Sequence, residues 1–257
     1  MKQFNISYTF LSTYKRCHRR ALLQYVEQVV PREKVDHRNF IVGICADQLF
    51  NKWVKEGYRE NWMENEAESW FKWFAGKRLV RYRNMEDRDK LIRKLQISVN
   101  RLQEAAFCEK LPQRNVEMQK KLEHLGEDFK FVGRLDMWFP DEKAVWDLKI
   151  TEAKRYLDNF QLYFFAWLFK QTGIEIKSLA FLSPLMLPYL KTVDWSLSAL
   201  ADFEQELFYL LELIKAEDWR ITAKDCWGCP VGAWCEEPPD SYSKIKKTKV
   251  GGIRFDL

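Results

Sequence analysis

Four cysteines carry the clearest chemical signal in the sequence. Cys17 lies near the start of the chain, and Cys226, Cys229 and Cys235 lie in the segment CWGCPVGAWC near the end. Thiolates bind soft metals, and one distant cysteine followed by C-x2-C-x5-C is more typical of a 4Fe–4S cluster than of zinc, which favours paired C-x2-C knuckles. We therefore expect these cysteines to hold one metal centre that joins the two ends of the chain, with a zinc-stapled structural protein as an alternative.

Two aspartates and a lysine form a second group. Asp136 ends the segment GRLD, and Asp147 and Lys149 lie two residues apart in the segment WDLK. Residues two apart on a strand project from one face, and neighbouring strands would bring the two carboxylates close together. Such a pair repels unless a cation or a proton lies between them, and Mg²⁺ or Mn²⁺ would resolve the conflict, with the carbonyl of Leu148 as a further ligand. The pattern is loose, so turn aspartates and an exposed lysine are the alternative.

The chemistry that these residue types favour is hydrolysis of a phosphodiester. A bound divalent ion acidifies water and neutralises charge on the phosphate, and Lys149 would orient the water or stabilise the added negative charge. Gln161 lies within an apolar helical stripe, where its amide needs hydrogen-bond partners. We expect Gln161 either to bond to backbone at the edge of the core or to face the metal site and contact Lys149.

The elements that must position these residues alternate along the chain. Helices are expected from Ser12, as N-cap, to Tyr25, over 39–58 and almost throughout 60–110. A three-strand meander follows over 115–125, 129–139 and 144–151, and then a helix over 153–171, a strand over 176–184 and a helix over 198–216. This order predicts an α/β or α+β fold with a mixed sheet flanked by helices.

Composition places the chain among ordinary globular proteins. It has 257 residues, of which 47% are hydrophobic and 31% charged, and it shows no apolar run near the roughly 20 residues of a membrane span. We expect one domain in the cytoplasm without a membrane partner, in which Cys45 and Cys108 are buried thiols. The net charge of +5 argues only weakly for nucleic acid, although the tail over 241–257 is basic.

These motifs together resemble the PD-(D/E)XK nuclease superfamily, and specifically its RecB-like iron–sulfur branch, which includes the AddB nuclease and the CRISPR-associated adaptation exonucleases. FLSTYKRC is similar to the opening helix of that branch with its first cluster cysteine, Cys17, and CWGCPVGAWC to its closing cysteine motif. GRLD matches the strand with the first metal-binding aspartate, Asp136. WDLKIT matches the D-x-K strand, which assigns Asp147 to the metal and Lys149 to catalysis. Gln161 matches the glutamine of the Q-x-x-x-Y helix.

The sequence departs from that branch in three places. The G-x-x-x-H histidine, a metal ligand, corresponds to Asp47, the Q-x-x-x-Y tyrosine corresponds to Phe165, and the proline after the first cysteine is His18. Aspartate also binds Mg²⁺ or Mn²⁺, so the resemblance still implies a metal site of Asp47, Asp136, Asp147 and the Leu148 carbonyl. Glu117 is a weaker candidate near this site.

The resemblance implies a restriction-endonuclease-like sheet core over 112–185, a helical subdomain over 40–110 and a C-terminal part over 198–257. It implies a divalent-metal-dependent exonuclease acting on single-stranded DNA ends, with a structural 4Fe–4S cluster. Some Trp and Arg side chains of the helical subdomain could then stack on bases, although core packing explains most of them. The alternative is a catalytically silent DNA-binding subunit that assists a helicase, recombination protein or integrase in repair or CRISPR adaptation.

Overall fold

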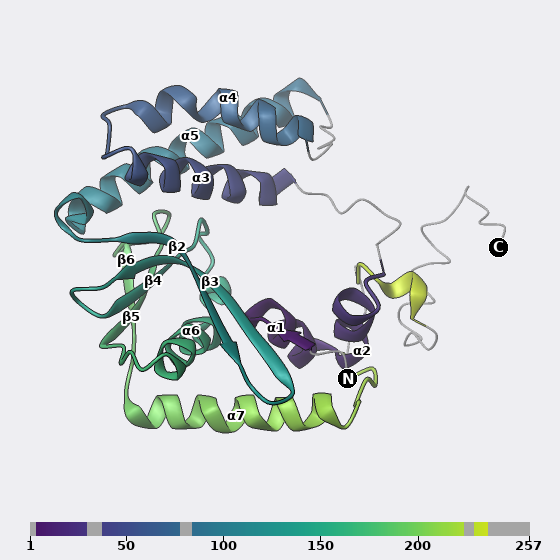
Figure 1. Cartoon of the computed structure of the whole chain (residues 1–257). Coiled ribbons are helices and arrows are strands. Elements are labelled where there is room, and N and C mark those ends of the chain that lie inside the picture. The colour runs from purple at the N-terminus through teal and green to yellow at the C-terminus, as the bar shows by residue number, and fades with distance from the viewer. Residues whose placement is uncertain (1–3, 30–37, 78–83, 224–228, 236–257) are drawn as a thin grey trace, which may run out of the picture. The chain divides into compact units, whose positions relative to one another are not determined.

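The computed structural model describes residues 4–29, 38–77, 84–223 and 229–235 (Figure 1). The chain divides into two compact units, one formed by Met1–Asn5 with Asp36–Glu204 and the other by Ile6–Val35 with Gln205–Leu257. In the described parts, no helix is both long enough and apolar enough to span a bilayer.

The first unit is built on a mixed sheet, as the sequence predicted. Its strands run in the order β1-β3-β4-β5-β6, and β2 pairs with β3 outside that path. The β2–β3, β3–β4 and β5–β6 pairs are antiparallel, whereas β4 and β5 are parallel. The strands are β1 Phe4–Ile6, β2 Glu117–Leu125, β3 Phe129–Phe139, β4 Ala144–Leu148, β5 Ser178–Leu182 and β6 Leu190–Val193. The short strands β1 and β6 were not expected from the sequence.

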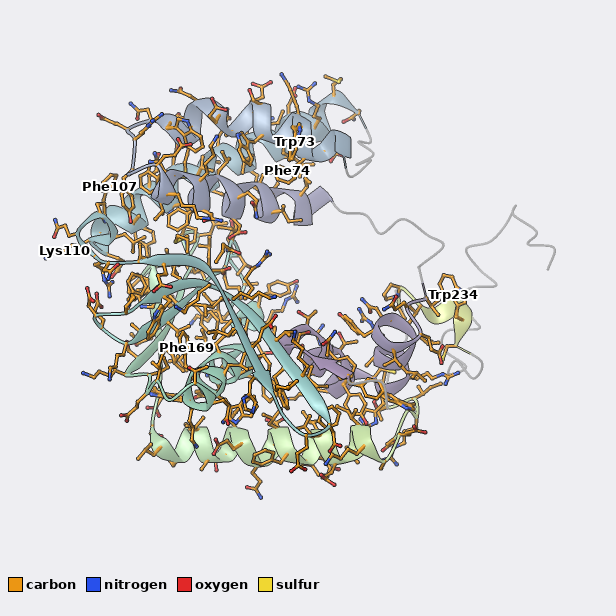
Figure 2. The ribbon with its side chains drawn as sticks, in the orientation of Figure 1. Trp73, Phe74, Phe107, Lys110, Phe169 and Trp234 are labelled. Atoms are coloured by element: carbon orange, nitrogen blue, oxygen red, sulfur yellow. The ribbon has the colours of Figure 1, made fainter. Side chains whose placement is uncertain are left out.

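Three helices cover one face of this sheet. They are α3 Arg38–Lys55, α4 Trp62–Lys77 and α5 Met85–Cys108, and Figure 1 shows α3 nearest to the strands. Trp53 and Phe50 of α3 are fully buried in one core cluster with Phe139 and Trp146 of the sheet. Trp73 of α4 is instead 51% exposed and lies beside Phe74 (Figure 2). Core packing thus accounts for the largest aromatic side chains on this face but not for Trp73.

A single helix, α6 Asn159–Gln171, packs on the opposite face of the sheet. Phe169 of α6 lies against Trp138 of β3, with ring centroids 4.3 Å apart (Figure 2). A Cβ atom added at Gly133 would approach Leu168 Cδ1 to 2.8 Å, so the glycine of GRLD allows α6 and β3 to approach closely. The expectation that this helix begins near residue 153 was wrong, because the Asp158 side chain accepts a hydrogen bond from the Phe160 backbone N–H and starts the helix there.

The second unit is built from the two ends of the chain. It contains α1 Tyr8–Arg16, α2 His18–Ala21 and a π-helical turn over Leu22–Val26, together with the last part of α7 Leu197–Lys215. The single helix expected from Ser12 to Tyr25 was therefore wrong on two counts. Ser7, not Ser12, caps α1 by accepting from Phe10 N at 3.2 Å. The extended backbone of Cys17 then separates α1 from α2.

Candidate active site

The site residues expected from the sequence come from four elements of the first unit. Asp136 lies on β3, Asp147 on β4, Lys149 directly after β4 and Gln161 in the first turn of α6. Asp47 lies in the middle of α3. The structure brings these five side chains together through the hydrogen bonds and electrostatic interactions described below.

Asp136 is held by both of its carboxylate oxygens. Oδ2 accepts from the backbone N–H of Leu148 at 2.8 Å, which links β3 to the end of β4. Oδ1 accepts from the side-chain amide of Gln119, a residue of β2, at 3.0 Å. These two contacts hold the carboxylate on the strand next to the one that carries Asp147.

Asp147, Lys149 and Gln161 form a closed triangle of polar contacts. Asp147 is only 2% exposed, and its Oδ2 lies 2.6 Å from Lys149 Nζ. Lys149 Nζ donates to Gln161 Oε1 at 2.8 Å, and Gln161 Nε2 donates to Asp147 Oδ1 at 2.8 Å. From the first turn of α6, the Gln161 side chain thus contacts the lysine and the acid rather than backbone.

Burial sets the protonation of the carboxyl groups. It is the largest cause that raises the pKa of Asp147 to about 7, followed by the charge of Asp136, while Lys149 opposes the shift. Burial and then Asp136 likewise raise the pKa of Asp47 to about 7. Burial also raises the pKa of Asp136. A divalent cation would neutralise these three carboxyl groups as protons do, so their chemistry fits Mg²⁺ or Mn²⁺.

The carboxylates do not form a finished coordination shell. Within the described residues, no three His, Cys, Asp or Glu side chains are spaced so that they could hold a metal ion as they stand. Asp147 instead contacts Lys149 and Gln161, and Asp47 lies 3.5 Å from the Gln119 amide. Binding of an ion would therefore require small side-chain rotations within the site.

Gln119 is the site residue that the sequence did not indicate. It lies opposite Asp136, between the paired positions Met118–Met137 and Lys120–Leu135, and its φ of 56° is left-handed. Its Nε2 donates to Asp136 Oδ1 and to Asp47 Oδ1. A glutamine within an otherwise ordinary strand segment gives no sequence signal for either feature, because both depend on the neighbouring strand and on α3.

The remaining candidates lie in different surroundings. Phe165 packs against Gly133, so the position of the family tyrosine is apolar here, and the Tyr163 hydroxyl donates instead to the Asp194 carbonyl at 2.9 Å. Tyr163 therefore does not supply the missing hydroxyl at the Phe165 position. Glu117 is exposed and pairs with Lys120 at 2.6 Å.

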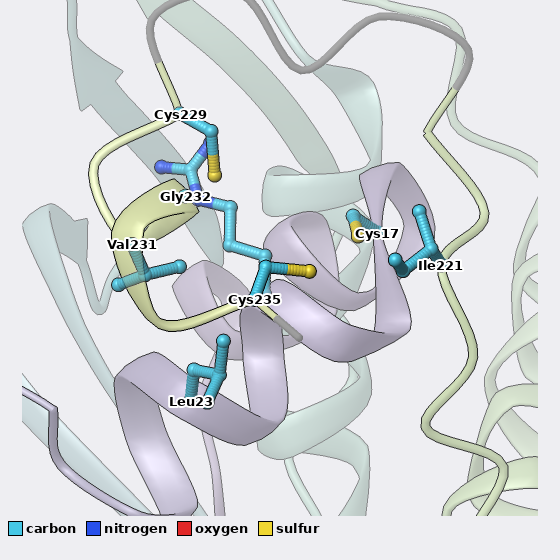
Figure 3. A pocket seen from close by; sticks show the side chains of 8 residues that line it. Cys17, Leu23, Ile221, Cys229, Val231, Gly232 and Cys235 are labelled. Carbon is cyan, nitrogen blue, oxygen red and sulfur yellow. The ribbon is translucent and has the colours of Figure 1, made fainter. Parts of the chain in front are cut away.

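Three of the four cysteines that we expect to bind a metal line one pocket in the second unit. Figure 3 shows the thiols of Cys17, Cys229 and Cys235 directed into the same space, which is also lined by Leu23. Cys226 lies outside the described residues. Among the described residues, no three potential ligand side chains are spaced so that they could hold a metal ion as they stand. The three thiols are included in this statement.

The other two cysteines differ from each other. Cys45 is buried in α3, as expected. Cys108 is exposed, which corrects the expectation of a buried thiol, because it is the last residue of α5.

Comparison with solved structures supports the fold. A crystal structure of a candidate exonuclease from Eubacterium rectale superimposes with a TM-score of 0.54 at 12% identity, covering 96% of this chain and 93% of that one. The crystal structure of SSO0001 matches at 13% identity over 92% of this chain and 87% of that one, but its TM-score of 0.38 carries no argument. No curated protein matches the chain.

Comparison with family models gives a match over most of the chain. The model described as the PD-(D/E)XK nuclease superfamily matches residues 5–236, which include both aspartates, the lysine and all four cysteines. The mixed sheet that carries Asp136 and Asp147 on adjacent strands agrees with that match. The chain therefore belongs to the PD-(D/E)XK nuclease superfamily.

Proposed function

We propose that this protein is a divalent-metal-dependent DNA exonuclease of the RecB-like iron–sulfur branch, with a preference for single strands. The observation that carries the proposal is the convergence of Asp136, Asp147 and Lys149, in which buried carboxyl groups of raised pKa lie beside a lysine ammonium group. Perturbed carboxyl groups of this kind cluster at catalytic sites.

Each residue has a distinct role in this proposal. Asp136 and Asp147 would hold Mg²⁺ or Mn²⁺, with Asp47 and the Leu148 carbonyl as further ligands. When bound, the ion supplies an acidified water and neutralises negative charge on the phosphate. Lys149 lies beside Asp147 and can donate a hydrogen bond to a phosphate oxygen or orient the water. Gln161 fixes the direction of that ammonium group by accepting a hydrogen bond from it.

The segment between Lys149 and Gln161 supports a single-stranded substrate. Lys154, Arg155 and Tyr156 are exposed, and Tyr156, 55% exposed, lies under the Arg155 guanidinium at 5.1 Å. Tyr156 is five residues from Gln161, and five extended residues span at most about 17 Å. An aromatic ring with two adjacent cations near a hydrolytic site suits an unpaired base with its phosphates.

The iron–sulfur part of the proposal rests on chemistry and spacing. Cys17, Cys229 and Cys235 share one pocket, and thiolates of this number and spacing suit a 4Fe–4S cluster once Cys226 joins them. Its role would be structural, because it joins the N-terminal and C-terminal segments of the second unit. Iron and sulfide analysis of anaerobically purified protein tests this, and zinc in their place would contradict it.

The test of catalysis uses 5′- and 3′-labelled oligonucleotides with Mn²⁺ or Mg²⁺. The wild type should shorten single strands progressively from an end, and Asp147→Asn should reduce the rate at least about 100-fold, because the carboxylate charge is lost at almost unchanged volume. Asp141→Asn, in the exposed turn between β3 and β4, is the matched control and should retain full activity.

Two results would reject this function. Cleavage that survives in Asp147→Asn would place the chemistry elsewhere. Binding of single strands by a wild type that never cleaves them would support instead the silent DNA-binding subunit, working with a helicase, recombination or integrase partner.

The single-strand preference has its own test. Tyr156→Ala should raise KM for single strands about 10-fold, with little change in kcat, because a stacked base is worth on the order of 1–3 kcal/mol. Phe107→Ala removes a similarly exposed ring at the end of α5 and should leave KM unchanged. Equal KM values for wild type and Tyr156→Ala would remove this loop from the substrate-binding surface.

A further inference from the structure

Gln119 has a strained backbone conformation, and its side-chain amide contacts two acidic residues. Among the described residues other than glycine, seven have a positive φ, and Gln119 is the one that lies inside a strand. The other six lie in turns, bends or irregular segments. A side chain with a Cβ adopts this left-handed region at a cost in free energy, and such strain persists where the surrounding structure requires it.

The strained residue lies where the side chains at odd and even positions exchange the faces of the sheet to which they point. Phe131 and Trp138 of β3 both contact α6, through Trp167 and Phe169, although an odd and an even position should face opposite sides of a regular strand. Met137 lies in the core cluster on the α3 side. The reversal therefore falls between Phe131 and Met137, in the stretch that contains Asp136, the residue opposite Gln119.

The amide of Gln119 joins two acids that come from different elements. Asp47 lies on α3 and Asp136 on β3, and Gln119 Nε2 lies 3.5 Å from an oxygen of the first and 3.0 Å from an oxygen of the second. The assignment of nitrogen to this position follows from both neighbours being carboxyl oxygens, which accept hydrogen bonds. A donor placed between two carboxylates holds both of them beside the same amide group.

We propose that Gln119 is a positioning residue for the metal ligands, whose strained backbone is retained because it places the amide between Asp47 and Asp136. This inference rests on the proposed divalent-metal site and adds to it a residue that acts through the two carboxylates. Partners that orient metal-binding carboxylates typically contribute 10- to 100-fold to metal affinity.

Replacement of Gln119 by glycine separates the backbone from the amide. Glycine adopts the same φ without strain, so Gln119→Gly should raise Tm, yet it should weaken Mn²⁺ binding about 10- to 100-fold because the bridging amide is lost. Gln119→Met keeps the length of the side chain but not the donor, and it should weaken Mn²⁺ binding to the same extent. Lys143→Gly is the matched control: Lys143 has φ 52° in the exposed turn between β3 and β4, so the change should raise Tm and leave Mn²⁺ affinity unchanged.

The measurement is titration of Mn²⁺ by electron paramagnetic resonance without DNA, with Tm recorded in a chelator. Wild-type affinity in both Gln119→Gly and Gln119→Met would overturn the inference, and so would tighter binding. Because this readout needs no cleavage, a wild type that binds Mn²⁺ but does not cut DNA would reject the proposed function and leave the role of Gln119 standing.

Discussion

Asp47 and Asp147 hold protons near neutral pH because burial and a neighbouring carboxyl group disfavour their charged forms. The same interactions that would favour a bound cation at the proposed site therefore weaken the protein when no cation is present. Placing three acids together therefore lowers the free energy of unfolding, and this effect can be measured as a dependence of stability on pH.

The metal-free protein should lose stability as the pH rises. The pKa of Asp47 and that of Asp147 are raised from 3.8 to about 7, so the folded state binds more protons than the unfolded chain between these values. The free energy of unfolding then falls from about pH 4 to about pH 7, by on the order of a few kcal/mol. Thermal unfolding in a chelator tests this, and added Mg²⁺ should flatten the slope.

Asp147→Asn provides the comparison for that slope. It removes one of the titrating groups, so its stability should fall less with pH than that of the wild type, while Asp141→Asn should follow the wild type. If wild type and Asp147→Asn show the same slope in chelator, Asp147 does not titrate in this range.

At the scale of the elements, the close contact between β3 and α6 positions the network that we propose to be catalytic. A Cβ at Gly133 would lie 2.8 Å from Leu168 Cδ1 and 3.1 Å from Phe165 Cε1. Both side chains are buried, so they or α6 itself would have to shift, and α6 carries Gln161 at its start. The glycine of GRLD therefore affects the position of Lys149 through the helix.

Gly133→Ala should destabilise the protein by about 1–3 kcal/mol, the usual cost of overpacking a core, and should also lower activity. Gly43→Ala is the matched control, because a Cβ there would meet nothing within 4 Å in α3. It should be neutral or stabilising by up to about 1 kcal/mol. Urea unfolding measures both, and an unchanged midpoint for Gly133→Ala would show that α6 can move away at no cost.

The elements also show what local sequence can and cannot predict. Phe129–Phe139 is a strand over the predicted range, because alternation and flanking turns are local signals. The cap of α1 was misplaced because Ser7 and Ser12 are the same favoured N-cap residue type, and only the fold selects Ser7. No local sequence pattern predicts the left-handed conformation of Gln119. Its side chain contacts Asp136 and Asp47, which lie far away in sequence.

At the scale of the whole molecule, the second unit must bring together two segments that residues 36–204 of the first unit separate in sequence. Contacts between them include the Tyr14 hydroxyl to the Asp218 carbonyl at 2.8 Å and Arg19 N to the Arg220 carbonyl at 3.1 Å. Lys15 also pairs with Glu206 at 2.6 Å. Closing a loop of about 200 residues costs roughly 5 kcal/mol in chain entropy, which these contacts must offset in the absence of a crosslink.

Cys17→Ser should show how much of that cost a metal cluster offsets. We expect loss of iron and visible absorbance, and a fall in stability of at most about 5 kcal/mol, since the polar contacts between the two segments remain. Cys108→Ser, an exposed thiol at the end of α5, should keep iron and stability. Because Asp136, Asp147 and Lys149 all lie in the other unit, Cys17→Ser should still cleave DNA at low temperature and lose activity only as it unfolds. A variant that stays folded yet is inactive would mean that the cluster takes part in the reaction rather than in holding the ends of the chain.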